Sequence, residues 1–280
     1  MSIPPQCAML PGGRLHLQHG PIDLVVLAEG EPAVVQRGYA ALTTWFATVL
    51  DGLCEELPAL RSPSRAGRPM LTGPVAKRME DAVMPFAAAG FITPMAAVAG
   101  AVADAALGVL CQGGGLRRAF VNNGGDIALH LATGERFRAG LVDRPDRPGL
   151  FARTIIGAGD GIGGIATSGW PGRSFSLGIA DAVTICAATA AQADAAATIV
   201  ANAVDLPGHP AIHRVAADSV RADSDLRGRL VTRAVGPLAR QEIAQALAAG
   251  ARVADDLIAA GLIVAAALHC QGVTRVAGAG

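Results

Sequence analysis

The sequence predicts an α+β protein in which mixed or antiparallel sheets and packed helices form two intimate halves around a central cleft. Short apolar or alternating segments bounded by glycine and proline indicate strands, and segments with apolar residues three or four apart indicate helices between them. Of the 280 residues, 51% are hydrophobic and 16% are charged, which is enough apolar surface for a large core. We expect a single domain spanning 1–280, with its motif-bearing core at about 90–205.

The N-terminal portion, 14–89, is predicted to hold one hairpin and two helices. Residues 14–18 and 22–28 flank a short turn sequence, His-Gly-Pro. From Pro32 to about residue 57, apolar residues recur every three or four positions, which predicts one long helix. Pro74 opens a second helix that ends near residue 89. The arginine-rich stretch 61–73 between them is either a solvated loop or a loop that closes over phosphate groups.

The rest of the chain alternates between strands and helices. The glycine-rich run 157–164 superficially resembles a dinucleotide-binding fingerprint, but no strong helical pattern follows it, so we interpret it as a turn. The core is expected to hold a small-residue helix at 94–110, strands at 117–122, 126–131, 136–142, 151–157 and 181–187, and a helix at 192–204. The C-terminal α/β portion, 206–280, is expected to contain a strand, an acidic turn at 223–225, a helix at 238–249 and a final strand at 262–268.

Composition excludes several classes of partner. A net charge of +0 and 4% aromatic residues leave neither the basic surface nor the stacking platform that nucleic-acid binding needs. The five cysteines contain no CxxC pair, so no zinc site or disulfide framework is expected and a reducing, cytoplasmic location fits.

Membrane segments are not expected either. Residues 1–10 lack the apolar core of a secretory signal, and the two most apolar windows, 95–110 and 257–268, are expected to be core elements because the first contains Asp104 and the second is too short to span a bilayer. The low charge content favours a homodimer, because few charges are available to cover the surface.

The central stretch Asn123-Gly124-Gly125-Asp126 interrupts what otherwise reads as one buried strand over 119–131. Two adjacent glycines permit positive φ angles, so main-chain N–H groups can face an anion or a flat ring, and Asn123 and Asp126 add directed hydrogen bonds. The pattern indicates a nucleotide or flavin contact. An Asn-Gly hairpin turn would have the same sequence.

Asp194 and Thr198 lie four residues apart in a segment of high helix propensity, so both side chains project from one helix face. A carboxylate and a hydroxyl suit an oxygen-preferring cation such as Mg²⁺, with waters and substrate phosphate completing its shell. The alternative is that Asp194 interacts favourably with the helix dipole and that Thr198 is simply exposed.

A second polar cluster follows a predicted turn. It comprises Thr167, Ser168, Gly169 and Trp170, with Arg173 close behind. Hydroxyls, a guanidinium and an aromatic ring can hold a diphosphate or a flat ring. A serine nucleophile is not expected, because no GxSxG elbow surrounds Ser168.

The order of these motifs resembles that of the FAD:protein FMN transferase superfamily, the ApbE-like proteins once associated with thiamine biosynthesis. The resemblance covers roughly 95–205 and favours ligand contact for the Gly-Gly-Asp stretch. It implies a site for FAD or FMN and Mg²⁺, with Asp194 and Thr198 as metal ligands and transfer of FMN to a threonine of an acceptor protein. Its implied flavin-site residues are Gly100, Asn123, Gly124, Gly125, Asp126, Thr167, Ser168 and Gly169.

The chain also departs from that family. Where the family has a lysine and an aromatic residue around the matched glycine, this chain has Ala99 and Ala101. The family's His-Ile-x-Asp-Pro segment, whose histidine is expected to activate the acceptor hydroxyl, is replaced here by Gly-Ile-Ala-Asp-Ala at 178–182. A missing general base removes about 10²–10⁴-fold in rate. Asp104 and Asp181 are the acids that match catalytic positions.

The whole chain most resembles an uncharacterised branch of the superfamily, through FITPMAAVAG at 91–100 and ATSGW at 166–170. The expected function is Mg²⁺-dependent flavin binding, with hydrolysis of the FAD diphosphate or a divergent FMN transfer. The alternatives are a non-catalytic flavin or nucleotide binder, and an enzyme for another phosphorylated or pterin-like substrate. For that last alternative Thr93, Trp170 and Arg173 would be the altered specificity contacts.

Overall fold

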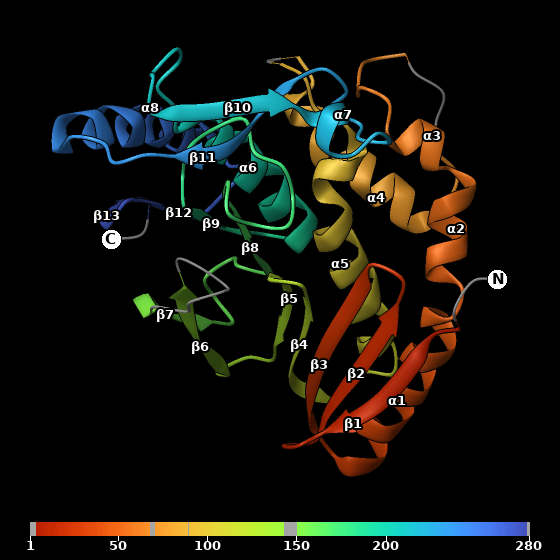
Figure 1. Ribbon diagram of the computed structural model, residues 1–280. Helices are drawn as coiled ribbons and strands as arrows, with labels where there is room; N and C mark the ends of the chain where they lie inside the picture. Colours follow the sequence, from red (N-terminus) through yellow and green to blue (C-terminus); the bar gives the residue numbers. More distant parts are fainter. Residues whose placement is uncertain (1–3, 68–70, 89, 143–149, 279–280) are drawn as a thin grey trace.

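The computed structural model describes residues 4–67, 71–88, 90–142 and 150–278. Its main element is a nine-stranded sheet in the order β1-β2-β3-β4-β5-β8-β9-β12-β13, and every neighbouring pair is antiparallel (Figure 1). The strands of this sheet are β1 (Gln6–Leu10), β2 (Arg14–His19), β3 (Ile22–Gly30), β4 (Leu116–Asn123), β5 (Asp126–Leu131), β8 (Gly164–Ser168), β9 (Ala182–Ala187), β12 (Ala265–Cys270) and β13 (Val273–Ala277). The predicted α+β class with antiparallel sheets is confirmed.

Two strand pairs lie outside the large sheet, and both are antiparallel. They are β6 (Arg136–Val142) with β7 (Leu150–Gly157), and β10 (Ile212–Ala216) with β11 (Leu230–Val235). Figure 1 shows the first pair on the side of the sheet away from α4 and α5, and the second pair near α6, α7 and α8.

A layer of helices covers one face of the sheet, because α1, α5, α6 and α8 pack in turn against one another and against successive strands. The helices are α1 (Pro32–Phe46), α2 (Val49–Glu55), α3 (Leu57–Leu60), α4 (Pro74–Val83), α5 (Val98–Cys111), α6 (Ala190–Ala203), α7 (Ala217–Val220) and α8 (Arg240–Ala259), with short 3-10 turns η1 (Met84–Phe86) and η2 (Pro94–Ala97). Buried alanines on α5 and α6 let these two central helices approach closely.

The predicted N-terminal hairpin is confirmed as β2 and β3, whereas β1 was not predicted. Its five residues are almost all exposed, so the alternation that marks a half-buried strand is absent. The single long helix expected over 32–57 is wrong, since the segment forms α1, α2 and α3. Phe46 at the end of α1 and Val49 at the start of α2 both face the core. The apolar spacing therefore continues across the break between these two helices and does not reveal it. Pro58 lies in the first turn of α3, where its ring disfavours a continuous helix.

The second predicted helix is α4, which ends at Val83 and continues as η1, where Pro85 lies in the first turn. Residue 89, its expected end, and residues 68–70 of the arginine-rich stretch lie outside the described residues. The run 157–164 forms a turn between β7 and β8, as predicted. Strand β8 was not predicted, because it starts with Gly164. A Cβ there would lie 2.1 Å from the backbone nitrogen of Ala190, so only glycine allows α6 this close.

In the C-terminal portion, helix α8 runs ten residues beyond its predicted end at 249, and the last predicted strand is β12. The edge strand β13 was not predicted, since four of its five residues are exposed. The stretch Pro94–Cys111, which holds η2 and α5, is long and apolar enough to cross a membrane by composition alone. In the fold it packs against α1, α4, α6, β4 and β5, so it is a core helix of this protein, as predicted.

Candidate functional site

The Gly-Gly stretch is a two-residue hairpin turn that joins β4 to β5. Asn123 and Asp126 pair across the turn, and Gly124 and Gly125 have φ angles of +65° and +118°. Positive φ at both central positions is what a type I′ hairpin turn requires. The backbone N–H of Gly125 donates to the side-chain oxygen of Asn122, 2.8 Å away. The turn interpretation is confirmed, and the ligand contact stays a prediction.

Asn123 ties this turn to the start of helix α5. Its Nδ2 donates to the carbonyl of Ala99 at 3.1 Å, and its Oδ1 accepts from the backbone N–H of Asp23 at 3.4 Å. The side chain is buried. Both ends of the amide therefore already have protein partners, so Asn123 positions the glycine turn.

Asp126 begins β5 beside the second polar cluster. Its Oδ1 accepts from the backbone N–H of Thr167 at 3.3 Å. Arg173 reaches the same turn from the loop after β8, where its Nη2 donates to the carbonyl of Gly124 at 3.3 Å. Burial raises the pKa of Asp126 to about 7, although the Thr167 hydrogen bond and the charge of Arg173 act in the opposite direction.

Asp194 lies on α6 and faces the first turn of α5. Its Oδ2 accepts from the backbone N–H of Gly100 at 3.0 Å. Burial raises the pKa of Asp194 well above its ordinary value, and repulsion from Asp126 raises it further. Thr198 lies one turn along α6 and is half-buried. The structure thus brings two mutually repelling carboxylates together beside the glycine turn.

Asp104 and Gly100 serve the contact between α5 and α6. The carboxylate of Asp104 accepts from the first two backbone N–H groups of α6, those of Ala190 at 3.0 Å and Ala191 at 2.9 Å. A Cβ on Gly100 would lie 2.2 Å from the carbonyl oxygen of Ala190. Helix packing therefore explains both residue types, and their roles towards a ligand or a reaction stay predictions.

Trp170 and Asp181 form a separate group at the other end of the loop after β8. The indole Nε1 of Trp170 donates to Oδ1 of Asp181 at 3.3 Å, and the backbone N–H of Gln271 donates to Oδ2 at 2.6 Å. A Cβ on Gly169 would lie 2.2 Å from the carbonyl oxygen of Asp181. Each Asp181 oxygen accordingly has a protein donor. Ser168 ends β8 opposite Val183 and is half-buried.

Thr93 lies just before η2 and is held by the predicted acidic turn at 223–225, a contact that sequence reasoning missed. Its buried hydroxyl donates to Asp225 at 2.5 Å. Nearby, the guanidinium of Arg229 lies 3.3 Å from the centre of the Phe91 ring. We call residues 217–229 the strap, because these contacts lay it over the start of η2. Asp225 comes from 132 residues away, so no local pattern could have paired it with Thr93.

The side-chain oxygens around Asp194 suit a hard cation such as Mg²⁺, but the described residues do not supply a complete set of protein ligands for one. Within the described residues no group of three or more His, Cys, Asp or Glu side chains converges on a common point. Mg²⁺ is commonly held by one or two carboxylates together with substrate phosphates and waters. Asp194, Thr198 and the nearby Asp126 could supply oxygens of this kind.

Comparison with known proteins decides the family. A family model described as "AbpE bacteria" matches residues 7–276, which is nearly the whole chain. The chain belongs to this family. The match confirms the resemblance to the ApbE-like superfamily that the ordered motifs indicate.

Curated relatives of this chain include proteins of methanogenic archaea. This member of the family is 37% identical over 134 residues to a UPF0280 protein of Methanospirillum hungatei, covering 44% of this chain and 50% of that protein. It is 36% identical over 142 residues to a UPF0280 protein of Methanosphaerula palustris, covering 46% and 52%. The chain thus spans about half the length of the curated relatives it matches.

Solved structures with a similar overall course include the flavinyl transferase ApbE of Pseudomonas stutzeri in its apo form. That structure shares 14% identity and a TM-score of 0.43, over 97% of this chain and 93% of that chain. The ApbE protein of Thermotoga maritima shares 17% identity and a TM-score of 0.34, over 64% of this chain and 68% of that chain.

Proposed function

We propose that this protein binds a flavin nucleotide, FAD or FMN, together with Mg²⁺ between the β4–β5 turn and helix α6. The observation that carries the proposal is the carboxylate pair Asp126 and Asp194. Burial raises the pKa of both carboxyls, and the negative charge of Asp126 raises the pKa of Asp194 further. A divalent cation bound at the carboxylates would remove this repulsion. A flavin is proposed as the ligand because the chain belongs to the ApbE-like superfamily.

The surroundings of the pair suit a phosphorylated ligand. Gly124 and Gly125 are exposed. A Cβ on Gly125 would meet no atom within 4 Å, so a ligand can approach the backbone there, whereas the guanidinium of Arg173 lies directly against Gly124. Arg173 is exposed and reaches this turn, and a guanidinium matches the geometry of phosphate oxygens. Thr167 and Ser168 carry hydroxyls at the end of β8, and the hydroxyl of Thr167 is hydrogen-bonded to that of Thr184 at 2.9 Å. Together these residues would bind the diphosphate of FAD opposite the carboxylates.

Asp194 and Thr198 would hold the Mg²⁺, with Asp126 as a neighbouring carboxylate. When bound, the cation would neutralise phosphate charge and polarise a phosphoryl oxygen. The fit is supported by the oxygen-only donor set and by the electrostatic repulsion that a cation would relieve. Thr93, Asn123, Gly100, Asp104, Gly169, Trp170 and Asp181 would then shape and position the site through the contacts described above.

A bound FAD could be hydrolysed, or it could donate FMN to an acceptor protein. Hydrolysis of FAD would add water across the P–O–P link and give FMN and AMP. For transfer to an acceptor protein, the chain lacks the family's histidine, which is expected to activate the acceptor hydroxyl, because Gly178 stands at its position. A Cβ on Gly178 would lie 2.0 Å from the carbonyl oxygen of Ala201, so a histidine there would not fit without a shift of the backbone. This close approach favours the second candidate function, a flavin binder without transferase activity.

Calorimetry with FAD and with FMN, in Mg²⁺ and in EDTA, tests the proposal. We expect FAD binding that weakens at least tenfold in EDTA and in Asp194→Asn, and that weakens in Thr198→Val. The matched control is Asp81→Asn, an exposed carboxylate on α4, which should bind like the wild type. Affinity that is unchanged by EDTA and by Asp194→Asn would overturn the metal site, and absence of FAD binding would overturn the function.

Turnover is measured separately by chromatography of FAD incubated with the protein and Mg²⁺. Release of FMN and AMP in equal amounts assigns hydrolysis, whereas tight binding with intact FAD assigns the binder.

A further inference from the structure

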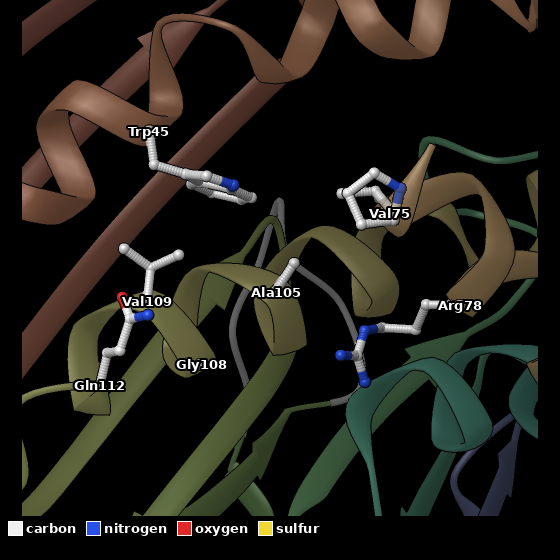
Figure 2. Close-up of a pocket in the computed structure, with 8 residues that line it drawn as sticks. Trp45, Val75, Arg78, Ala105, Gly108, Val109 and Gln112 are labelled. Carbon is white, nitrogen blue, oxygen red and sulfur yellow. The ribbon is translucent and has the colours of Figure 1, made fainter. Parts of the chain in front are cut away.

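A cavity of about 280 Å³ that is open to solvent lies between α1, α4 and α5, and none of its lining residues belongs to the candidate flavin site. Figure 2 shows the indole of Trp45 on one side, Val75 across from it, and the α5 residues beneath. Arg78 reaches in from α4 at one end, and the amide of Gln112 lies at the other. The walls are mainly apolar, with a few polar groups at the ends. This is the usual composition of a small-molecule site.

Gly108 forms part of the cavity floor, and packing does not explain why this residue is a glycine. A Cβ on Gly108 would meet no atom within 4 Å. By contrast, a Cβ on Gly100 of the same helix would collide with the backbone of Ala190, and one on Gly38 of α1 would lie 2.9 Å from the carbonyl of Leu110. Glycine within a helix costs stability relative to alanine. At Gly108 the visible effect of the missing side chain is open space in front of Trp45.

Among the described residues that line the cavity, Arg78 is the one with a charged side chain. It is exposed, and it forms no salt bridge with another described residue. The charge of Arg78 is felt by Asp104: burial raises the pKa of Asp104, and the guanidinium acts in the opposite direction. The Asp104 carboxylate itself accepts two backbone N–H groups of α6. The cavity therefore joins a flat aromatic wall to a cation that has room for an anionic partner.

We infer that this cavity binds a small aromatic anion, an aryl carboxylate of one or two fused rings. The ring lies against Trp45 over Gly108, and the carboxylate meets the guanidinium of Arg78. Aromatic rings stack on indole in offset or edge-on arrangements, and guanidinium groups recognise carboxylates through paired donors. The volume of about 280 Å³ lies just below the range of about 300–1,000 Å³ that is usual for ligand pockets, so only a small molecule of this kind fits. The inference is independent of the flavin proposal, because the two sites share no residue.

Fluorine NMR of protein labelled with 5-fluorotryptophan tests it, because the chain has two tryptophans, Trp45 and Trp170. The resonance absent in Trp45→Phe belongs to Trp45. With 2-naphthoate as the probe, we expect a saturable shift of the Trp45 resonance and no shift of the Trp170 resonance. The uncharged twin 2-naphthamide should bind about five- to tenfold more weakly, as should 2-naphthoate to Arg78→Ala.

Matched variants separate the cavity from general effects. Gly108→Leu fills the floor and should abolish the shift, whereas Gly52→Leu adds the same side chain at an open glycine on α2 and should leave binding unchanged. Lys77→Ala removes an exposed cation next to Arg78, outside the cavity lining, and should also bind normally. An unchanged Trp170 resonance in Gly108→Leu reports an intact fold. Absence of a Trp45 shift, or equal binding by wild type and Gly108→Leu, would overturn the site, and equal binding of acid and amide would overturn the anion.

Discussion

Asp104 and Asp194 cap each other's helices. Asp104 on α5 accepts from the N–H groups of Ala190 and Ala191 that open α6, and Asp194 on α6 accepts from the N–H of Gly100 in the first turn of α5. Both carboxylates lie at the positive end of a helix dipole and satisfy donors that a helix cannot satisfy within itself. The two central helices are therefore joined at their N-terminal ends by two reciprocal contacts.

Removal of the cap on α6 should destabilise the fold. Asp104→Ala leaves the N–H groups of Ala190 and Ala191 without their acceptor, and we expect a loss of about 1–3 kcal/mol in the free energy of unfolding. Urea denaturation measures this loss. Asp81→Ala, on the exposed face of α4, should stay within about 0.5 kcal/mol of the wild type. Equal stabilities of the two variants would contradict the capping role.

Two glycines of α5 should respond to alanine with opposite signs. At Gly100 a Cβ collides with the carbonyl of Ala190, so Gly100→Ala should destabilise the protein by about 1–3 kcal/mol or more. At Gly108 a Cβ meets nothing, so Gly108→Ala should stabilise it by about 0.5–1 kcal/mol through helix propensity. Thermal unfolding of both variants compares them directly, and a shift in the same direction would refute the packing account.

Asp126 should make stability fall as pH rises. Burial raises its pKa in the fold to about 7, above the ordinary 3.8. A carboxyl with a raised pKa imposes no penalty below about pH 4, an increasing penalty between about pH 4 and 7, and the full penalty above that range.

Asp126→Asn should therefore match the wild type near pH 4 and be more stable by about 2–4 kcal/mol at pH 8. Urea denaturation at pH 4, 6 and 8 checks this, with the exposed Asp255→Asn as the control. A stability difference that does not change with pH would rule out the raised pKa.

The strap should loosen when Thr93 loses its hydroxyl. Thr93→Val keeps the side-chain shape but removes the donor to Asp225, a loss of about 1 kcal/mol that opens the strap about fivefold more often. Limited trypsin digestion should then cleave faster at Arg227, which has a φ of +53°. Ser219→Ala, whose hydroxyl donates to the carbonyl of Ala216 just before the strap, serves as a comparison. Equal cleavage rates in wild type and Thr93→Val would show that this hydrogen bond does not hold the strap.

Residues close in sequence were predicted well, and partners far apart were not. The Gly-Gly turn, the helix bearing Asp194 and Thr198, and strands β4, β5 and β9 follow from local patterns. The reciprocal caps join residues 86, 87 and 94 positions apart, and such pairs leave no periodic signal. Edge strands β1 and β13 were missed because exposed strands lack the alternation that burial imposes. A homodimer, a cytoplasmic location and an acceptor protein stay predictions.

The large sheet is narrowest where its two halves meet. Strands β5 and β8 register through two residue pairs, Ile127 with Ile165 and Ala128 with Gly164. Across this seam the two halves are also joined by the packing of α5 against α6 and by the reciprocal caps of these helices. Asp126 belongs to one half and Asp194 to the other, so the repulsion between their charges acts across the seam. Neutralising either carboxylate would therefore remove a repulsion between the two halves of the sheet.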